Sequence, residues 1–395
     1  MPILGSSSSG GSRPTTPTIG TVTAGNTSAS VPFTASSYVG KGTITYTATS
    51  NPGGFTGTGS SPITVSGLTN GTSYTFTVVG ATNYGISSEA SAASNSVTPV
   101  TPRAGFFVGG QGSGATIDKI LFSNDTVSTL SATLSPSRGY TAGFANSGTA
   151  GYTAGGTQSS NFSTISKLAF ATETASNLAS NLPQDRVAAG GMANSGTAGY
   201  IAGGYSTVTL SSIVKLLFSN DSVSTISAVM SIAKSYNSGF ANSGTAGYYM
   251  GGSSLDGESN YSTIDKLTFS NDTRSSAGNS GLGPYPAMGT AFANSGTAGY
   301  MTATQGPGGG TSQIEKLTFS NDSKSILATT LSQARYQASS CANSGVAGYL
   351  GGGNGVGNQT TFNKLTFSTD TRSVTSSSLS VFRVMMASYA NSANL

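Results

Sequence analysis

The chain has 395 residues with 55 glycines, 17 basic and 13 acidic side chains, one cysteine, and neither histidine nor tryptophan. Charged residues make up 8% of the chain, against roughly 25% in an average soluble domain. Hydrophobic residues at 36%, with 17 each of Tyr and Phe, supply enough apolar area for cores, so the composition predicts a folded chain. At about 150 residues per domain, the length predicts two or three domains.

The missing histidine excludes much catalytic chemistry. Imidazole is the commonest metal ligand and the usual general base near neutral pH, so Ser-His-Asp and Cys-His arrangements and most zinc or copper sites cannot be assembled. Cys341 occupies a repeat position that holds phenylalanine or methionine in other copies, which favours a small core residue over a nucleophile. We therefore expect no enzyme activity, no metal and no cofactor.

The charges and the N-terminus restrict the partners. The net charge of +4 is spread along the chain without a Lys/Arg cluster, so we expect no nucleic-acid partner. No stretch approaches 18 apolar residues, and the start MPILGSSSSGGSRPTTP lacks the basic and apolar regions of a signal peptide. We expect neither membrane insertion nor export by the general secretory route. Residues 1–13 form a Gly/Ser tract that predicts a flexible tether.

Residues 14–100 alternate short β-prone runs with turn residues. Candidate strands are 19–22, 28–34, 43–49, 63–65, 74–79 and 94–98, several with the period-2 alternation of half-buried strands. The motif LTNGTSY, from Leu68 to Tyr74, resembles the fibronectin type III family, which places a leucine six residues before a corner tyrosine. The resemblance implies a β-sandwich in which the Tyr74 hydroxyl returns to the backbone, Leu68 packs beneath it, and Phe33 replaces the family's core tryptophan.

Residues 101–395 repeat one unit six times. Two markers recur at intervals of about 49 residues, which predicts six copies of one supersecondary unit. The first is Ala-Asn-Ser, beginning at Ala145, Ala193, Ala241, Ala293, Ala342 and Ala390. The second is Lys-(Ile/Leu)-x-Phe or a close variant, beginning at Lys119, Lys167, Lys215, Lys266, Lys316 and Lys364. Each copy predicts four strands, as in RGYTAGFA, AGYTAGG, STISKLAF and the segment after the ATET turn.

An Arg or Lys opening the first strand, an aromatic residue before a double glycine, and the period near 50 together resemble the kelch β-propeller family. The resemblance implies an all-β protein with a six-bladed, kelch-like β-propeller after the fibronectin-like sandwich. The array opens with a second strand, 106–110, and ends with an unpartnered first strand, 382–392. We expect the C-terminal strand to lie innermost beside 106–110, which closes the disc and removes exposed sheet edges.

One face of the predicted disc carries the candidate ligand-binding residues. A basic residue stands seven positions before Ala-Asn-Ser in every copy but the one with Pro286, namely Arg138, Arg186, Lys234, Arg335 and Arg383. These five cations are predicted to surround the channel mouth. Hydrogen bonding to neighbouring loop carbonyls, as the kelch resemblance implies, is favoured, and binding of an anionic sugar or a carboxylate is the alternative. The variable loops of this face add aromatic side chains that stack on pyranose rings, Phe162, Tyr205, Tyr261 and Tyr285.

The opposite face carries one acid per copy in a short turn: Asp125, Glu173, Asp221, Asp272, Asp322 and Asp370. Asn and Asp tolerate left-handed dihedral angles and cap their own backbone, so turn chemistry is favoured over an acidic binding ring. The repeated Lys is expected to lay its stem along the neighbouring blade, with the ammonium in water.

The two modules and the start MPILGSSS are similar to those of phage virion proteins. This resemblance implies a tail or capsid appendage that assembles in the host cytoplasm and is extracellular after lysis. Its N-terminal region would contact other virion proteins, and its propeller would bind host-surface polysaccharide weakly, with avidity from many copies. The alternatives are a purely architectural capsid decoration or neck or tail accessory protein, and a bacterial secreted adhesin. Both a monomer and a homo-oligomer fit the sequence.

Overall fold

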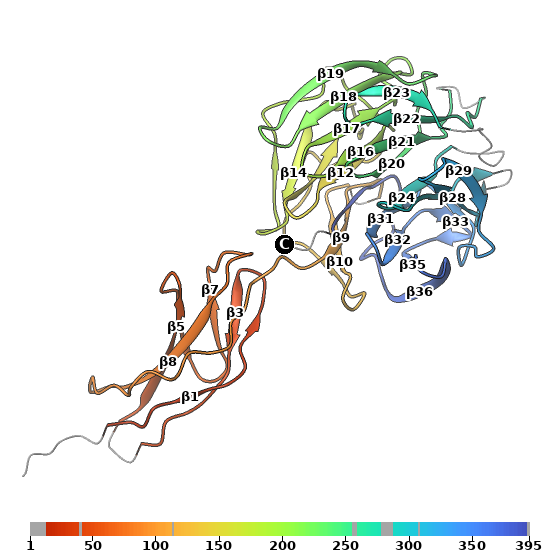
Figure 1. Ribbon diagram of the computed structural model, residues 1–395. Coiled ribbons are helices and arrows are strands. Elements are labelled where there is room, and N and C mark those ends of the chain that lie inside the picture. The colour runs from red at the N-terminus through yellow and green to blue at the C-terminus, as the bar shows by residue number, and fades with distance from the viewer. Residues whose placement is uncertain are drawn as a thin grey trace, which may run out of the picture. The chain divides into compact units, whose positions relative to one another are not determined.

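The computed structural model describes residues 13–38, 42–112, 114–254, 259–277, 287–306 and 309–392. Within these ranges the protein is all-β, as expected, and no helix is present. It follows that the described residues contain no helix able to span a membrane. The chain divides between Pro102 and Arg103 into two compact units, here called the N-terminal unit and the ring unit (Figure 1). Of the expected tether, only Arg13 lies within the described residues.

The N-terminal unit is built from short strands around one apolar core. In its described part, two three-stranded sheets, β2-β3-β7 and β6-β5-β8, accompany the small β1-β4 pair. The strands are β1 (Thr18–Ile19), β2 (Thr23–Ala24), β3 (Ser28–Val31), β4 (Phe33–Thr34), β5 (Ile44–Asn51), β6 (Thr56–Gly59), β7 (Ile63–Ser66) and β8 (Thr75–Thr82). Val31, Val65 and Val78 are fully enclosed, and Leu68 and Tyr74 join the same core.

The strand expected at 94–98 is wrong, because only Val97 there forms a bridge, to Tyr74. The segment before it instead follows β8 with a three-residue period: the hydroxyls of Ser88, Ser91 and Ser94 accept from backbone N–H groups of β8 at 2.9 to 3.0 Å. The N–H groups of these serines still donate to β8 carbonyls. A period of three cannot satisfy the two-residue repeat of a ladder, so the serine hydroxyls take the place of backbone carbonyls as acceptors.

The ring unit contains, in the part of the chain that is described, six four-stranded antiparallel sheets. Sheet one joins β9 (Ala104–Val108), β10 (Ile117–Leu121) and β11 (Val127–Thr129) to β37 (Ala387–Asn391). The next two are β12 (Ala142–Asn146), β13 (Ala150–Ala154), β14 (Ile165–Ala169), β15 (Thr174–Asn177), and β16 (Gly190–Asn194), β17 (Ala198–Ala202), β18 (Ser212–Leu217), β19 (Ser222–Val229). Then follow β20 (Ser238–Asn242), β21 (Ala246–Met250), β22 (Ile264–Thr268), β23 (Thr273–Ser276), and β24 (Thr290–Asn294), β25 (Ala298–Thr302), β28 (Ile314–Thr318), β29 (Ser323–Ile326). The sixth is β31 (Ser339–Asn343), β32 (Ala347–Gly351), β35 (Thr361–Thr366) and β36 (Thr371–Ser378).

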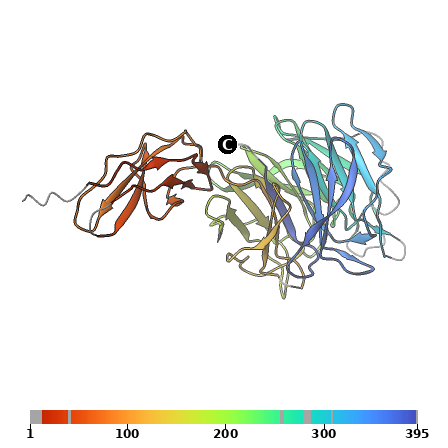
Figure 2. The ribbon, with the colours of Figure 1, turned by 90° about the horizontal axis from the view of Figure 1, so that it is seen from below.

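Short strands also occur in the loops of the last two repeats, β26 (Gln305–Gly306), β27 (Gly309–Gly310), β30 (Arg335–Tyr336), β33 (Asn354–Gly355) and β34 (Gly357–Asn358). The first strands of the sheets contact one another in a closed sequence, β12 to β16, β20, β24, β31, β37 and back to β12. The six sheets therefore lie around a common axis, with these strands innermost (Figures 1 and 2).

The two ends of the ring unit meet in one sheet. β37 pairs antiparallel with β9, placing Tyr389 opposite Phe106 and Ala387 opposite Val108. This is the pairing expected from the phase of the repeat. Because the last strand completes the first sheet, the inner edge of β9 is paired with β37 instead of being exposed.

Aromatic rings seat on glycines where neighbouring sheets meet. Phe144 of β12 stacks on Tyr152, with ring centroids 5.4 Å apart, and covers Gly199 of the next sheet. A Cβ on Gly199 would lie 2.1 Å from the Phe144 ring. The same position is glycine in the other sheets, Gly105, Gly151, Gly247, Gly299 and Gly348. Glycine at this position makes room for an inner-strand side chain of another sheet, an aromatic ring in four copies and Cys341 or Met192 in the other two, rather than for an unusual backbone angle.

We therefore expect Gly199→Ala to destabilise the ring unit by about 1–3 kcal/mol, because the added carbon must displace Phe144. Gly196→Asn is the matched control: Gly196 has φ of +82° and open space around it, a conformation that Asn tolerates. Thermal unfolding followed by circular dichroism measures both, and equal losses in the two variants would contradict this packing.

Removing residues 382–395 should leave β9 without its inner partner and open the ring. We expect the truncated chain to melt at lower temperature and to aggregate, as seen by size-exclusion chromatography and light scattering. Adding a synthetic peptide of residues 382–392 should restore part of the loss. A truncated chain as soluble and as stable as the full one would show that the β9–β37 pairing is dispensable.

Candidate functional site

The five predicted cations are enclosed within the sheets. Arg138, Arg186, Lys234, Arg335 and Arg383 are each at most 2% exposed. Arg138 Nε donates to the Gly155 carbonyl at 2.7 Å, and Arg186 Nη1 donates to the Gly203 carbonyl at 2.8 Å. Gly155 and Gly203 both have positive φ, which turns the chain so that these carbonyls meet the guanidinium.

The expected ring of accessible cations at the channel mouth is therefore not formed. The arginines donate mainly to backbone carbonyls, which is the interpretation that the sequence favours, and the double glycine supplies part of those acceptors. Burial lowers the pKa of Arg138, Arg186 and Arg335 to about 10, so all three stay protonated at neutral pH.

Two copies neutralise the buried cation with an acid. Arg383 Nη2 lies 2.6 Å from Asp118 Oδ2, and both side chains are fully enclosed. Lys234 Nζ lies 3.2 Å from Asp265 Oδ2; burial lowers the pKa of Lys234, and Asp265 opposes that shift. Pro286, which stands in this position in the fifth repeat, lies outside the described residues.

Truncating Arg186 tests this structural role. Arg186→Ala leaves the Gly203 carbonyl without this donor and removes one of the two donors to the Ser212 carbonyl, so we expect a loss of about 3 kcal/mol in the free energy of unfolding. Arg372→Ala, which removes one exposed hydrogen bond to Thr330, should change it by less than about 1 kcal/mol. Urea denaturation measures both, and an Arg186→Ala chain of normal stability would indicate a side chain held for another purpose.

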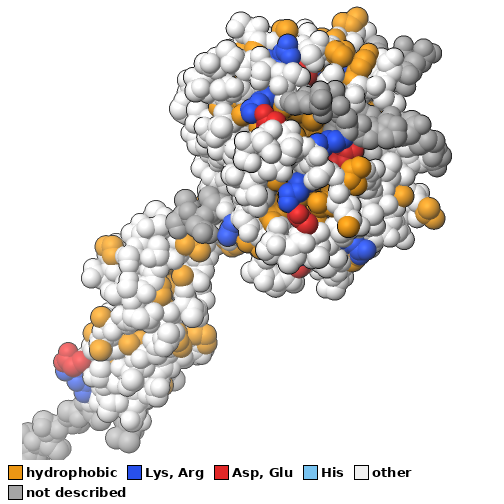
Figure 3. All heavy atoms as spheres, turned by 45° about the vertical axis from the view of Figure 1, so that its right-hand side comes forward, with side chains coloured by type: hydrophobic (Ala, Val, Ile, Leu, Met, Phe, Trp, Pro, Cys, Tyr) orange, Lys and Arg blue, Asp and Glu red, His pale blue; other side chains and the backbone are white. Residues whose placement is uncertain are grey.

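The repeated acids and lysines join neighbouring sheets. Asp221, in the turn after β18, accepts from the Tyr152 hydroxyl at 3.0 Å and from Lys167 Nζ at 2.7 Å, both of the preceding sheet. The triad recurs as Tyr200/Lys215/Asp272, Tyr248/Lys266/Asp322, Tyr300/Lys316/Asp370 and Tyr349/Lys364/Asp125. In the remaining copy Lys119 pairs with Glu173. Figure 3 shows such Lys and Asp side chains next to one another on the ring unit.

These acids have φ between 49° and 57°, as turn chemistry predicts. The lysines differ from expectation, because their ammonium groups are ion-paired rather than free in water. Burial and the hydrogen bond to Asp221 raise the pKa of the Tyr152 hydroxyl above its usual value. The acids thus have structural partners and form no open acidic ring.

The Ala-Asn-Ser-Gly turns also hold neighbours together. The Gly196 N–H donates to Asn146 Oδ1 at 2.9 Å, and the Ser147 N–H donates to Ser195 Oγ at 2.9 Å. Each of these bonds joins one sheet to the adjacent sheet. The same bonds recur around this face, which accounts for the near-identity of the turn between copies. We conclude that the polar groups on the face formed by these repeated turns are engaged in hydrogen bonds between neighbouring sheets.

The opposite end of the inner strands carries a backbone ring, here called the mouth ring. Among the described residues it has six members, all with φ between 54° and 58°: Tyr140, Ala188, Tyr236, Met288, Gln337 and Met385. Each N–H donates to the carbonyl of the preceding member, and Tyr140 closes the circle on Met385, at 2.8 to 3.3 Å. The backbone is therefore the same in every copy while the side chains differ.

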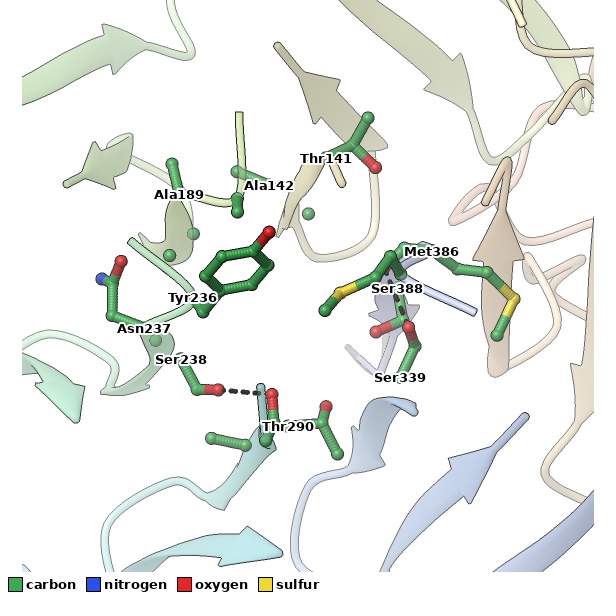
Figure 4. Close-up of a pocket in the computed structure, with 18 of the residues that line it drawn as sticks. Thr141, Ala142, Ala189, Tyr236, Asn237, Ser238, Thr290, Ser339, Met386 and Ser388 are labelled. Carbon is green, nitrogen blue, oxygen red and sulfur yellow. Dashed lines mark hydrogen bonds between the residues drawn. The ribbon is translucent and has the colours of Figure 1, made fainter. Parts of the chain in front are cut away.

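A cavity of about 140 Å³ lies within the mouth ring (Figure 4). Tyr140, Tyr236, Met288 and Met385 line it together with small residues of the inner strands, and none of the described lining residues is charged. Figure 4 shows the Tyr236 ring reaching into the middle of this space. A further cavity, of about 190 Å³, lies at the other end of the inner strands.

Three tyrosines gather on one side of the mouth. The ring centroid of Tyr236 lies 6.1 Å from that of Tyr140 and 6.5 Å from that of Tyr205. Burial raises the pKa of both Tyr140 and Tyr236, so their hydroxyls remain protonated and able to donate at neutral pH. Tyr336 of the last repeat and Gln111, which accepts from the Tyr140 hydroxyl at 3.3 Å, extend the group.

The four predicted loop aromatics have separate positions. Tyr205 joins the mouth, whereas Phe162 lies 5.9 Å from Arg138 Cζ and covers that buried guanidinium. Tyr261 follows β21 in its own loop and donates its N–H to the Gly252 carbonyl. Tyr285 lies outside the described residues.

Sequence reasoning missed Tyr140 and Tyr236. They stand two residues after the repeated basic residue, in a stretch that varies between copies, so the sequence carried no pattern that singled them out. Among the described residues, no three Asp, Glu or Cys side chains lie close enough together to hold a metal ion. Cys341 is buried, and burial raises the pKa of its thiol.

Neither a protein-family model nor a curated protein sequence matches the chain.

Proposed function

We propose that the chain is a non-enzymatic structural protein of a phage virion, a tail or capsid appendage. In this proposal the ring unit is a six-bladed, kelch-like β-propeller that binds host-surface glycans weakly and multivalently. The N-terminal unit is a fibronectin type III-like sandwich that contacts other virion proteins. The protein assembles in the host cytoplasm and is extracellular after lysis.

Topology supports both fold proposals. The inner-to-outer strand order within each four-stranded sheet, and the completion of the first sheet by the last strand, are typical of propellers. In the N-terminal unit the Thr69 N–H donates to the Tyr74 hydroxyl at 3.1 Å, the arrangement of a tyrosine corner. Phe33 lies in the core and stacks near Tyr46, at 4.7 Å between centroids, where the family's tryptophan would be expected.

The observation that carries the binding proposal is the contrast between the two ends of the inner strands. One end repeats the same turn and the same hydrogen bonds between neighbouring sheets, so its polar groups are already hydrogen-bonded. The other end holds the variable side chains of the mouth ring. Aromatic side chains line a cavity at both ends, so the contrast lies in the occupied turn groups at one end and the variable side chains at the other. Aromatic and neutral polar groups at a concave site are typical of carbohydrate recognition.

One observation favours the purely architectural alternative. The outer strands β19, β29 and β36 expose Val229, Ile326 and Val374 at 48%, 60% and 44%. Apolar side chains at the rim of the ring unit would suit contact with a neighbouring virion protein rather than with a polysaccharide.

Display at two valencies tests the proposal. The full chain, as a monomer and as a streptavidin-linked tetramer, is applied to an array of bacterial surface polysaccharides. We expect the tetramer to bind at least about 100-fold more tightly than the monomer. Absence of binding in both forms, with antibody labelling spread over the whole capsid in electron micrographs, would support decoration instead.

A further inference from the structure

We propose that the cavity inside the mouth ring binds one uncharged pyranose residue of a neutral glycan, packed against Tyr236 and Tyr140. This assignment rests on the proposed glycan-binding function and names its substrate class. It replaces the five cations as the binding determinant of this face.

Charge selects the ligand class. The described residues that line the cavity include no Lys, Arg, Asp or Glu. The basic side chains nearest in sequence, such as Arg138 and Arg186, are enclosed and donate to carbonyls of their own sheets. A carboxylate or sulfate entering this space would lose hydration without gaining a charged partner, so an acidic sugar is disfavoured.

The cavity size selects a single sugar ring. A protein cavity of about 150 Å³ holds one benzene molecule, and a hexopyranose has about twice as many non-hydrogen atoms, so the 140 Å³ cavity admits no more than one sugar ring, with its substituents directed out of the mouth. Larger glycans would extend outward between the loops. Ala188, the mouth-ring member between Tyr140 and Tyr236, leaves the space beside both rings unfilled by a longer side chain.

The wall offers the hydroxyl chemistry that a pyranose needs. Ser388 Oγ donates to the Ser340 carbonyl at 2.7 Å, and Ser238 Oγ donates to the Gly289 carbonyl at 2.8 Å. Each serine oxygen has thereby used its proton but keeps lone pairs that accept from sugar hydroxyls. The Tyr140 hydroxyl already donates to Gln111 Oε1, so the tyrosines contribute chiefly their ring faces, which pack against the C–H groups of the sugar.

The site is also pre-organised. Six backbone hydrogen bonds hold the mouth-ring residues at a positive φ that would cost free energy in a free chain. The closed ring therefore meets that cost during folding, and ligand binding requires little further ordering of the backbone.

The test uses the full chain with methyl galactoside and methyl N-acetylglucosaminide as neutral probes, and methyl glucuronide as the acidic probe. Saturation-transfer NMR and calorimetry measure binding for the wild type, Tyr236→Ala, Tyr236→Phe, Tyr140→Ala and the control Tyr84→Ala. We expect a neutral probe to bind, about tenfold more weakly in Tyr236→Ala and Tyr140→Ala. Tyr84, 68% exposed in the N-terminal unit, should be replaceable without effect, and Tyr236→Phe should retain most of the affinity. Thermal melts check that each variant is folded.

Three results would overturn the assignment, and they separate it from the proposed function. Polysaccharide binding that persists unchanged in folded Tyr236→Ala and Tyr140→Ala would place the glycan site elsewhere while leaving glycan binding intact. A preference for methyl glucuronide that weakens with salt would show the wrong substrate class. Binding to no probe and to no polysaccharide on the array would remove the proposed function together with this site.

Discussion

A single circle of backbone hydrogen bonds organises the ring unit. The Tyr140 N–H reaches the carbonyl of Met385, and this contact joins the second repeat to the last strand of the chain. It requires all six inner strands to approach closely enough for their main chains to meet. Small residues at the second inner-strand position, such as Gly143 and Gly191, follow from that requirement, since a Cβ on Gly191 would lie 2.6 Å from the Gly143 carbonyl. The close approach of the inner strands is thus a matter of backbone contact, which small side chains permit.

The few charges serve the same arrangement. The repeated charged side chains of the ring unit make hydrogen bonds within one sheet or ion pairs between neighbouring sheets. Arg186 fills the interior of its own sheet, whereas Lys167 and Asp221 join one sheet to the next. Arg186 and the Lys167–Asp221 pair are fully or partly buried. Salt screens buried charges less than charges on the surface. The acids and bases that composition alone offers as ligand contacts are therefore occupied within the fold.

The side chains left to recognise a ligand are the uncharged, variable side chains of the mouth ring. The mouth ring gives each repeat the same backbone position but four kinds of side chain among the six described members, from Ala188 to Tyr236. A symmetric scaffold thereby presents an asymmetric surface, with tyrosines on one side and Met288 and Met385 on the other. Changing one side chain at such a position alters the surface without altering the hydrogen bonds that close the ring, because those bonds involve only the backbone.

The sequence alone determined the all-β class, the six copies and the pairing of the last strand with the first, because these follow from local periodicity and repeat phase. It also indicated the left-handed turn at Asp221 from residue type. It misplaced the strand at 94–98, near which serine hydroxyls take the place of backbone carbonyl acceptors, and it left ligand binding at the mouth open as the alternative role of Arg138 and its equivalents. Only the tertiary structure decided which groups are enclosed, since burial depends on what neighbouring sheets cover. Tyr140, Tyr205 and Tyr236 come from different repeats, and their meeting depends on the curvature of the ring, which no local pattern encodes.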